Sequence, residues 1–186
     1  GTVTLQLDEG EYQVLIIGHS GEGKANPTFD NMCQVKFTNI TKSGGTGYSD
    51  TFYYYGDLTV GGEQQEKSFI LKRATAMFRL VSTDIKPSKV KAIRFLYTGG
   101  CGVFDATTGY GGTVNSQQVV IYETPEEFDG KTIQFDMFTF PKDETGKLKI
   151  NVRMFDNADI ENGVCIYERV FENVPIQRNT ITQYSG

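Results

Sequence analysis

The sequence predicts an all-β protein made of antiparallel β-sandwiches, and three observations support this class. Apolar residues recur at every second position in most segments, which is typical of strands with one buried face. Turn signals such as DEGE, KSGGTG and DETGK separate these segments. The 186 residues include 21 Gly, 13 Phe and 10 Tyr but no Trp. Roughly eleven short strands punctuated in this way are typical of sandwich folds.

The clearest strand is KLKINVRMF, residues 147–155, in which polar and apolar side chains alternate without interruption. Its apolar face carries Leu148, Ile150, Val152 and Met154. The segment TIQFDMF has the same period, with Ile133, Phe135 and Met137 on one face. We expect these two faces to pack together in one core, because period-two alternation places every second side chain on the same side of a sheet.

Residues 2–7 alternate in the same way, with Val3, Leu5 and Leu7 on one face, and other segments have the same character. The remaining strand candidates are residues 2–7, 12–17, 33–40, 51–60, 67–81, 90–97, 117–122, 164–171 and 179–184. The one helical candidate is a single turn at PEEF, residues 125–128.

The segment KSFILKRATAMFRLV contains a change of register. Its apolar residues occupy odd positions at Phe69 and Leu71 but even positions from Ala76 onward. Such a slip moves every later side chain to the opposite face of the strand. A β-bulge would produce it. A strand that leaves one sheet and enters the core of another domain would produce it as well.

We favour the second explanation, because enough chain lies on each side of the slip for a separate core. The domain boundary then falls near Lys72, inside a strand. This predicts two β-sandwich domains in tandem, residues 1–71 and residues 72–186, of which the first is short of strands.

The stretch GHSGEGKA, Gly18 to Ala25, matches the glycine and lysine spacing of a phosphate-binding loop. That motif also needs a Ser or Thr after the lysine and a helix that begins directly behind it. Here Ala25 stands at the hydroxyl position and Pro27 follows two residues later. We therefore interpret the stretch as a glycine-rich turn between strands and expect no nucleotide to bind.

Charge and cysteine content exclude further classes. The net charge of −5 lacks the basic footprint of a nucleic-acid partner. No apolar stretch reaches the length of a membrane-spanning helix. Gly1 does not begin a signal peptide, so we expect any targeting segment to have been removed. The cysteines Cys33, Cys101 and Cys165 lack zinc-site spacing, and we expect small buried hydrophobes rather than a disulfide framework, although one disulfide stays open.

No catalytic or metal-binding constellation stands out. His19 is the single histidine, and its position in the glycine-rich turn indicates an exposed loop residue. The carboxylates that could form a pair are scattered along the sequence: Asp84, Glu123, Asp136 and Asp156. We place Asp136 and Glu168 on solvated strand faces. DNADIENG lacks the spacing of a calcium loop and indicates a turn around Asn162–Gly163. We expect no enzyme activity, no cofactor and no metal.

The aromatic run TFYYYGD offers a candidate ligand surface. Alternation places Phe52 and Tyr54 on one side of the strand and Tyr53 and Tyr55 on the other. We expect at least one pair to lie in the core. The other pair, Tyr53 and Tyr55 or its counterpart, would be an amphipathic surface for a ligand or a neighbouring subunit.

Several segments resemble, in order, the fimbrillin-like proteins of Bacteroidales. ILKRATAMFRLVSTD resembles their mid-chain L-x-R-x-x-A segment, FDATTGYGG their aromatic Thr–Gly loop, and MFTFPKDETGKLKINVRMFDNAD their aromatic–Pro hairpin. LDEGEYQVLIIGHS is similar to their first strand pair. The most specific match is the final FENVPIQRNTITQYSG, which resembles their terminal signature at Val174, Pro175, Arg178, Asn179, Thr182 and Gly186.

This resemblance implies two transthyretin-like β-sandwiches in an exported protein of the cell surface or outer membrane. It implies a non-catalytic structural or adhesive component of a fimbria, as pilus subunit, anchor or tip, whose partners are other fimbrial subunits that join by strand addition. A host or bacterial surface ligand is a further expected partner. The lipobox cysteine that would carry a lipid anchor is absent from this sequence. The alternative is a surface carbohydrate-binding module that uses the patch around Tyr53 and Tyr55.

Counting strands gives one more expectation. A sandwich domain has about seven strands, whereas residues 1–71 offer five candidates, TVTLQL and the first half of KSFILKR included. We therefore expect the N-terminal domain to end in an unpaired edge or an open apolar groove, which a segment upstream of Gly1 or a neighbour would fill.

Overall fold

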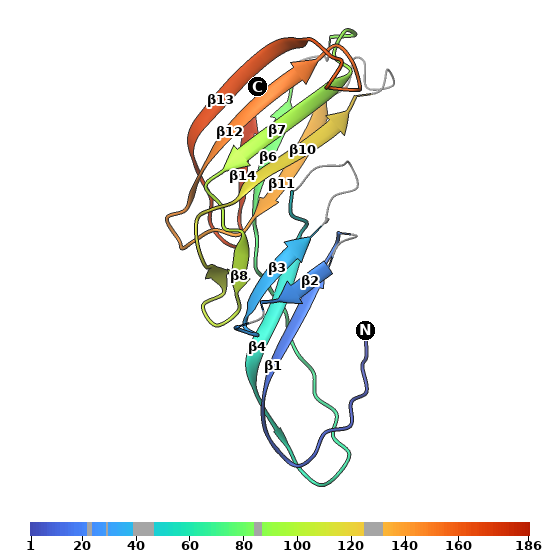
Figure 1. Cartoon of the computed structure of the whole chain (residues 1–186), viewed down its shortest axis with the longest axis vertical. Coiled ribbons are helices and arrows are strands. Elements are labelled where there is room, and N and C mark those ends of the chain that lie inside the picture. The colour runs from blue at the N-terminus through green and yellow to red at the C-terminus, as the bar shows by residue number, and fades with distance from the viewer. Residues whose placement is uncertain (22–23, 29, 39–46, 84–86, 125–131) are drawn as a thin grey trace.

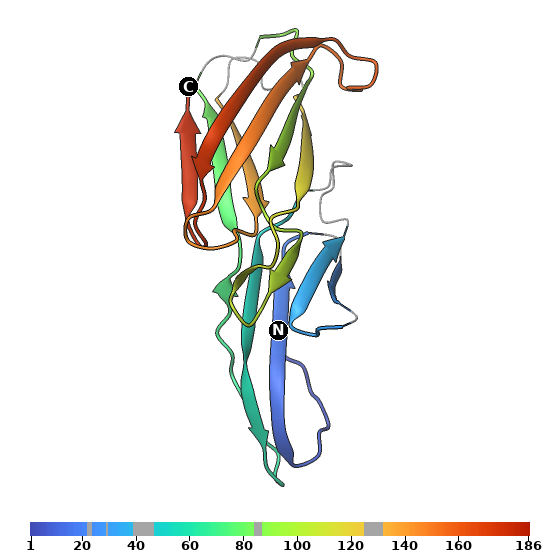
Figure 2. The same cartoon turned by 60° about the vertical axis from the view of Figure 1, so that its left-hand side comes forward.

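The computed structural model describes residues 1–21, 24–28, 30–38, 47–83, 87–124 and 132–186. These residues form fourteen strands in four sheets and no helix, which confirms the predicted all-β class. The chain is elongated and has two lobes, shown one above the other in Figures 1 and 2. The predicted helical turn at residues 125–128 lies outside the described residues.

The C-terminal lobe is a sandwich of two facing sheets. The four-stranded sheet has the order β10 (Gln117–Glu123), β7 (Ala92–Thr98), β12 (Lys147–Phe155) and β13 (Cys165–Pro175). The three-stranded sheet has the order β11 (Ile133–Thr139), β6 (Ala76–Ser82) and β14 (Ile181–Ser185). Pairing is antiparallel except between β14 and β6, which run parallel. The sheets are thus antiparallel as predicted, with one parallel pair that the sequence did not predict.

The core of this lobe contains the two predicted apolar faces. Leu148, Ile150 and Val152 of β12 are at most 2% exposed, and Phe135 and Met137 of β11 belong to the same cluster. Met154 and Ile133 are half-buried against it. Lys149 faces the opposite side and forms a surface ion pair with Glu172. The prediction that these faces share a core is confirmed.

The N-terminal lobe also has two sheets. One has the order β1 (Gly10–His19), β4 (Thr51–Val60) and β5 (Lys72–Arg73). The other has the order β2 (Lys24–Pro27), β3 (Gln34–Thr38), β8 (Val103–Asp105) and β9 (Tyr110–Gly111). The core cluster of this lobe joins side chains of both sheets with side chains of the adjoining segments: Val35, Phe37, Tyr53, Ala74, Cys101, Phe104, Ala106 and Phe140.

At the register slip in residues 67–81, the chain passes from the N-terminal lobe to the C-terminal lobe. β5 pairs with β4 in the N-terminal lobe, and β6 begins three residues later in the C-terminal lobe. The second half of the chain then returns, because β8 pairs with β3 and β9 pairs with β8. The lobes are therefore not two consecutive lengths of chain. The predicted division at residue 71 falls where the chain leaves the N-terminal lobe, but it does not account for β8 and β9, which belong to that lobe.

The terminal signature lies where the lobes meet. Arg178 donates a hydrogen bond from Nη1 to the Tyr53 hydroxyl at 2.8 Å, and its guanidinium lies 4.9 Å from the centre of the Tyr110 ring. Asn179 has a φ of 60° and donates its backbone N–H to the carbonyl of Thr75. Two residues of the signature thus hold the end of the C-terminal lobe against β4 and the segment that joins the lobes.

Three local predictions are wrong. Residues 2–7 and 67–71 form no strand in the described structure, because alternation favours a strand only where a partner strand is present. His19 is not an exposed loop residue: it ends β1 half-buried, with its ring centre 6.1 Å from that of Phe37. The cysteines are all free, and although Cys101 is buried, Cys165 is exposed.

Candidate functional site

The candidate site residues Tyr53 and Tyr55 lie on the core-facing side of β4. The Tyr53 side chain is 8% exposed, and its ring packs edge-on against Phe104 with centres 4.8 Å apart. Tyr55 is half-buried against the same cluster. A hydrogen bond with Cys33 raises the pKa of its hydroxyl. Alternation alone did not show which pair of β4 faces the core, and in the structure it is Tyr53 and Tyr55. Their role as a ligand surface stays a prediction.

The opposite side of β4 forms the outer face of the sheet, which we call the outer apolar face. The register of β1 with β4 places Ile16 opposite Tyr54 and Tyr12 opposite Leu58. The side chains that share this side are half-buried: Tyr12, Val14, Ile16, Phe52, Tyr54, Leu58 and Val60. Most sandwich sheets have one dry and one wet face. This sheet carries apolar side chains on both.

Part of the outer apolar face is covered by the segment that leads to β5. The Phe69 ring lies 4.8 Å from that of Tyr54, and the Arg73 guanidinium lies 5.0 Å from the centre of the Phe52 ring. Arg73 is held there by a two-pronged hydrogen bond to Asp50, from Nε at 2.9 Å and from Nη2 at 3.0 Å. Ile70 of the same segment is 86% exposed. The cover is therefore partial.

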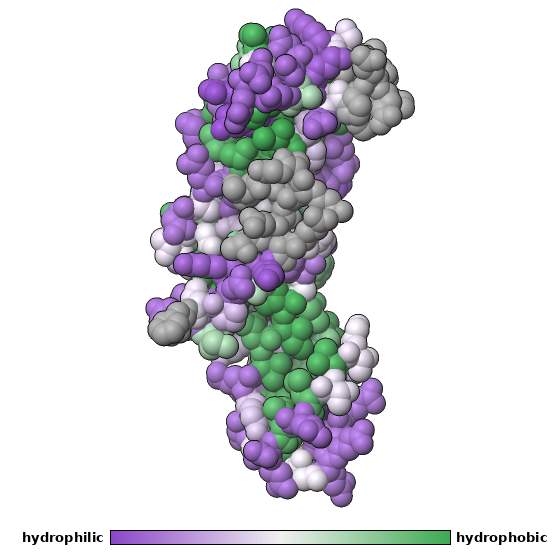
Figure 3. Space-filling model, turned by 45° about the vertical axis from the view of Figure 1, so that its right-hand side comes forward, coloured by the Kyte–Doolittle hydropathy of each residue, from purple (hydrophilic) through white to green (hydrophobic). Residues whose placement is uncertain are grey.

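The N-terminal segment adds further exposed apolar side chains to this lobe. Val3 is 80% exposed, Leu5 71% and Leu7 44%, and residues 1–8 have no strand partner among the described residues. Figure 3 shows a contiguous apolar area on the N-terminal lobe, whereas much of the visible C-terminal lobe is polar. Exposed apolar area of this kind marks interaction surfaces.

Both sheets of the lobe end in strands with a free edge. In the described structure, β1 has one neighbour, β4, along its ten residues, and the four-residue β2 has one neighbour, β3. An unpaired strand presents a row of backbone donors and acceptors that a strand of another chain can use. The strands β8 and β9 from the second half of the chain complete this lobe, so the expectation that it is short of strands is wrong, and the acceptor role of the β1 edge remains a prediction.

The described residues contain no arrangement typical of catalysis or metal binding. No group of three or more His, Cys, Asp or Glu side chains could hold a metal ion within them. Asp136 and Glu168 lie on outward faces as predicted, in ion pairs with Arg79 at 2.7 Å and Arg153 at 2.9 Å. GHSGEGKA leads into the strand β2 and not into a helix, and its residues 22–23 lie outside the described structure.

Sequence comparison places the chain in a family. Residues 2–186 match the model of a family of unknown function, DUF6562. The chain belongs to the DUF6562 family. No curated protein matches it. No helix in the described part of this DUF6562 protein is long and apolar enough to cross a membrane.

Two solved structures share the fold. A candidate adhesin from Bacteroides ovatus aligns with a TM-score of 0.53 and 12% identity over 97% of this chain and 76% of its own. A candidate cell adhesion protein from Bacteroides fragilis aligns with a TM-score of 0.50 and 11% identity over 97% of this chain and 61% of its own. The DUF6562 chain thus spans less than two thirds of the second protein. At these identities the likeness concerns the fold.

Proposed function

We propose that this chain is a non-catalytic structural or adhesive component of a bacterial surface fimbria, as pilus subunit, anchor or tip. It is exported to the cell surface and acts through strand edges and subunit interfaces. The observation that carries the proposal is the edge of β1, which has no second neighbour among the described residues and lies beside the outer apolar face. A surface of this kind suits permanent contact with another polypeptide more than contact with a small substrate.

Two further findings support this function. The fold is shared with candidate adhesion proteins of Bacteroides, the group to which the fimbrillin-like resemblance points. The exposed Val3 and Leu5 provide a second apolar element that a neighbouring subunit can cover. The carbohydrate-binding alternative draws no such support from Tyr53, because its ring is packed against Phe104 and not open to a sugar.

Immunogold electron microscopy of cells that express the natural gene tests the location. We expect gold label along surface filaments or at their bases or tips, and loss of that label in a deletion strain. Label confined to the cell interior, or filaments that are unchanged in the deletion strain and never labelled, would contradict the proposal.

Light scattering of the purified protein tests the surface itself. The double variant Val3→Ser, Leu5→Ser should associate less than the wild type at high concentration, because it removes exposed apolar area. Val164→Ser is the matched control, since Val164 is 64% exposed but lies in the turn before β13 on the other lobe. An equal effect from control and double variant would show that the N-terminal segment has no special part.

A further inference from the structure

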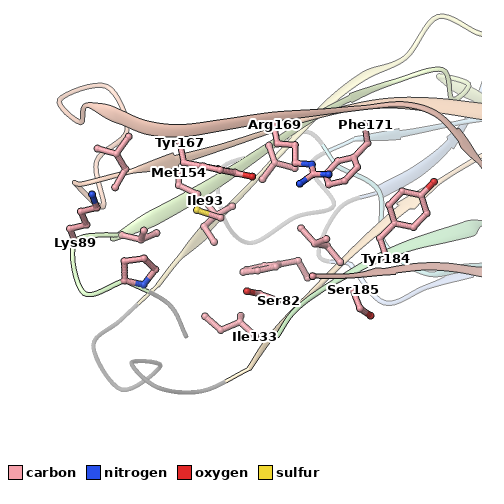
Figure 4. A pocket seen from close by; sticks show the side chains of 17 residues that line it. Ser82, Lys89, Ile93, Ile133, Met154, Tyr167, Arg169, Phe171, Tyr184 and Ser185 are labelled. Carbon is pink, nitrogen blue, oxygen red and sulfur yellow. The ribbon is translucent and has the colours of Figure 1, made fainter. Parts of the chain in front are cut away.

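A groove opens between the two sheets of the C-terminal lobe. It has a volume of about 960 Å³ and lies where β6, β12 and β14 end and where β11 and β13 begin. Its walls are apolar, with Leu80 and Phe135 on the three-stranded sheet and Ile93, Val152 and Met154 on the four-stranded sheet (Figure 4). The size and lining are those of a small-molecule site.

The groove is open at one end of the sandwich and filled by rings at the other. Phe171 and Tyr184 contact each other with ring centres 5.6 Å apart, and both lie against Phe78. These rings close the space between β13 and β14 below the groove. Beyond these rings Met154 and Ile133 are half-buried, so part of the apolar wall of the groove is open to solvent.

Arg169 is placed on the inner face of β13. The register pairs Arg169 with Val152 and Phe171 with Ile150, and both β12 partners are core residues. Arg169 therefore faces the groove between Tyr167 and Phe171, with its guanidinium 5.2 Å from the centre of the Phe171 ring. The preceding Glu168 lies on the outer face, where it pairs with Arg153. A side chain that faces the core at this position of a strand is ordinarily apolar, whereas here it is an arginine.

Among the described residues, the charged side chains that line the groove, Arg169 and Lys89, are both cations, although the protein as a whole has a net charge of −5. In the described structure neither cation forms an ion pair. The other polar side chains on the walls are hydroxyls, those of Ser82, Tyr167, Tyr184 and Ser185. Arg169 is exposed beside the apolar walls of the groove, and a guanidinium in that position suits an anionic partner.

We propose that this groove binds a single-chain amphiphile with an anionic head, a long-chain fatty acid. The alkyl chain lies between the sheets and the carboxylate accepts hydrogen bonds from the Arg169 guanidinium. An alkyl chain needs no hydrogen bonds, which suits walls of side-chain carbon, whereas a peptide carries a donor and an acceptor at almost every residue. The site is separate from the N-terminal surface of the proposed function.

Titration calorimetry with palmitate, kept below its micellar concentration, tests the proposal. We expect saturable binding at one site, weakened roughly tenfold or more by Arg169→Gln, because a charge-assisted hydrogen bond is lost. Arg153→Gln is the matched control, since Arg153 is an arginine of the same sheet that points to the outer face. Hexadecanol, which has the chain without the charge, should bind wild type and Arg169→Gln alike.

Filling the groove supplies a second test that does not depend on charge. Met154→Trp should abolish palmitate binding while the melting temperature and circular dichroism show that the variant is folded; if it does not fold, Ser82→Trp fills the same space from β6. Absence of saturable palmitate binding to the wild type would overturn the proposal. So would equal palmitate affinity in wild type and Arg169→Gln, or an Arg169-dependent self-association without palmitate uptake, which would assign the groove to a second copy.

Discussion

At the scale of single residues, a few polar side chains link parts of the chain that are far apart in sequence. Arg178 donates a hydrogen bond to the hydroxyl of Tyr53, which lies 125 positions earlier in the sequence. The Tyr53 side chain is buried, so this bond satisfies a hydroxyl that is largely removed from water. A buried polar group that loses its partner costs more than the bond itself contributes, since it was removed from water on folding. Arg178 is therefore one of the residues of the terminal signature that stabilise the junction of the lobes.

Arg178→Ala should lower the free energy of unfolding by roughly 1–3 kcal/mol, because it leaves the Tyr53 hydroxyl unpaired and removes the cation from the Tyr110 ring. Urea unfolding measures the change. The double variant with Tyr53→Phe should recover part of it, since the unpaired hydroxyl is then absent. A change as small as that of an exposed side chain, within about 0.5 kcal/mol, would show that the contact does not join the lobes.

Glu168 should make the protein sensitive to acid. Hydrogen bonds from Asn151 at 2.6 Å and from Arg153 at 2.9 Å lower the pKa of its carboxyl from the ordinary 4.5. The folded pKa is below the unfolded one, so the stabilisation is present above pH 4.5 and is lost as the pH falls through the lowered pKa. The stability difference between wild type and Glu168→Gln should therefore shrink on acidification and stay constant above about pH 6. A difference that is flat across the acidic range would contradict the assignment.

At the scale of elements, alternation predicts faces well where a strand has one wet and one dry side. β12 is such a strand, and its four apolar residues were assigned to the core from the sequence alone. β4 is not, because both of its faces carry aromatic rings. In β4, the buried side is the one that faces the second sheet of the lobe. Phe104 of β8, a strand from the other half of the chain, packs against Tyr53 on that side.

Ile150→Ala should lower the free energy of unfolding by about 2–5 kcal/mol, because its side chain is 0% exposed in the C-terminal core. Lys149→Ala, one residue earlier on the opposite face, should stay within about 0.5 kcal/mol, since its pair with Glu172 is exposed. Chemical denaturation of both variants compares them directly. Equal effects would reverse the assignment of faces.

At the scale of the whole molecule, the chain passes between the two lobes more than once, and its described part contains no helix start at which a nucleotide phosphate could bind. The glycine-rich stretch before Lys24 leads into β2, whereas a phosphate site needs converging N–H groups at a helix start. Mg-ATP or Mg-GTP should therefore leave the melting temperature unchanged. A ligand at 100 times its dissociation constant would add about 2.7 kcal/mol of stability, so a clear rise of the melting temperature would contradict this expectation.

The pattern of residues is sufficient to predict the all-β class, the faces of β11 and β12, and the passage of the chain between sheets near Lys72. These features follow from the alternation of apolar and polar side chains, which can be read within each strand without knowing its partner. The return of residues 103–111 to the N-terminal lobe and the parallel pairing of β14 with β6 are visible in the folded structure alone. Only the folded structure shows which side of β13 is inside, because Tyr167, Arg169 and Phe171 alternate with Glu168 and Val170, and neither set is distinctly apolar. Pairing between distant segments is a non-local property, and no window of the sequence records which partner a strand will meet.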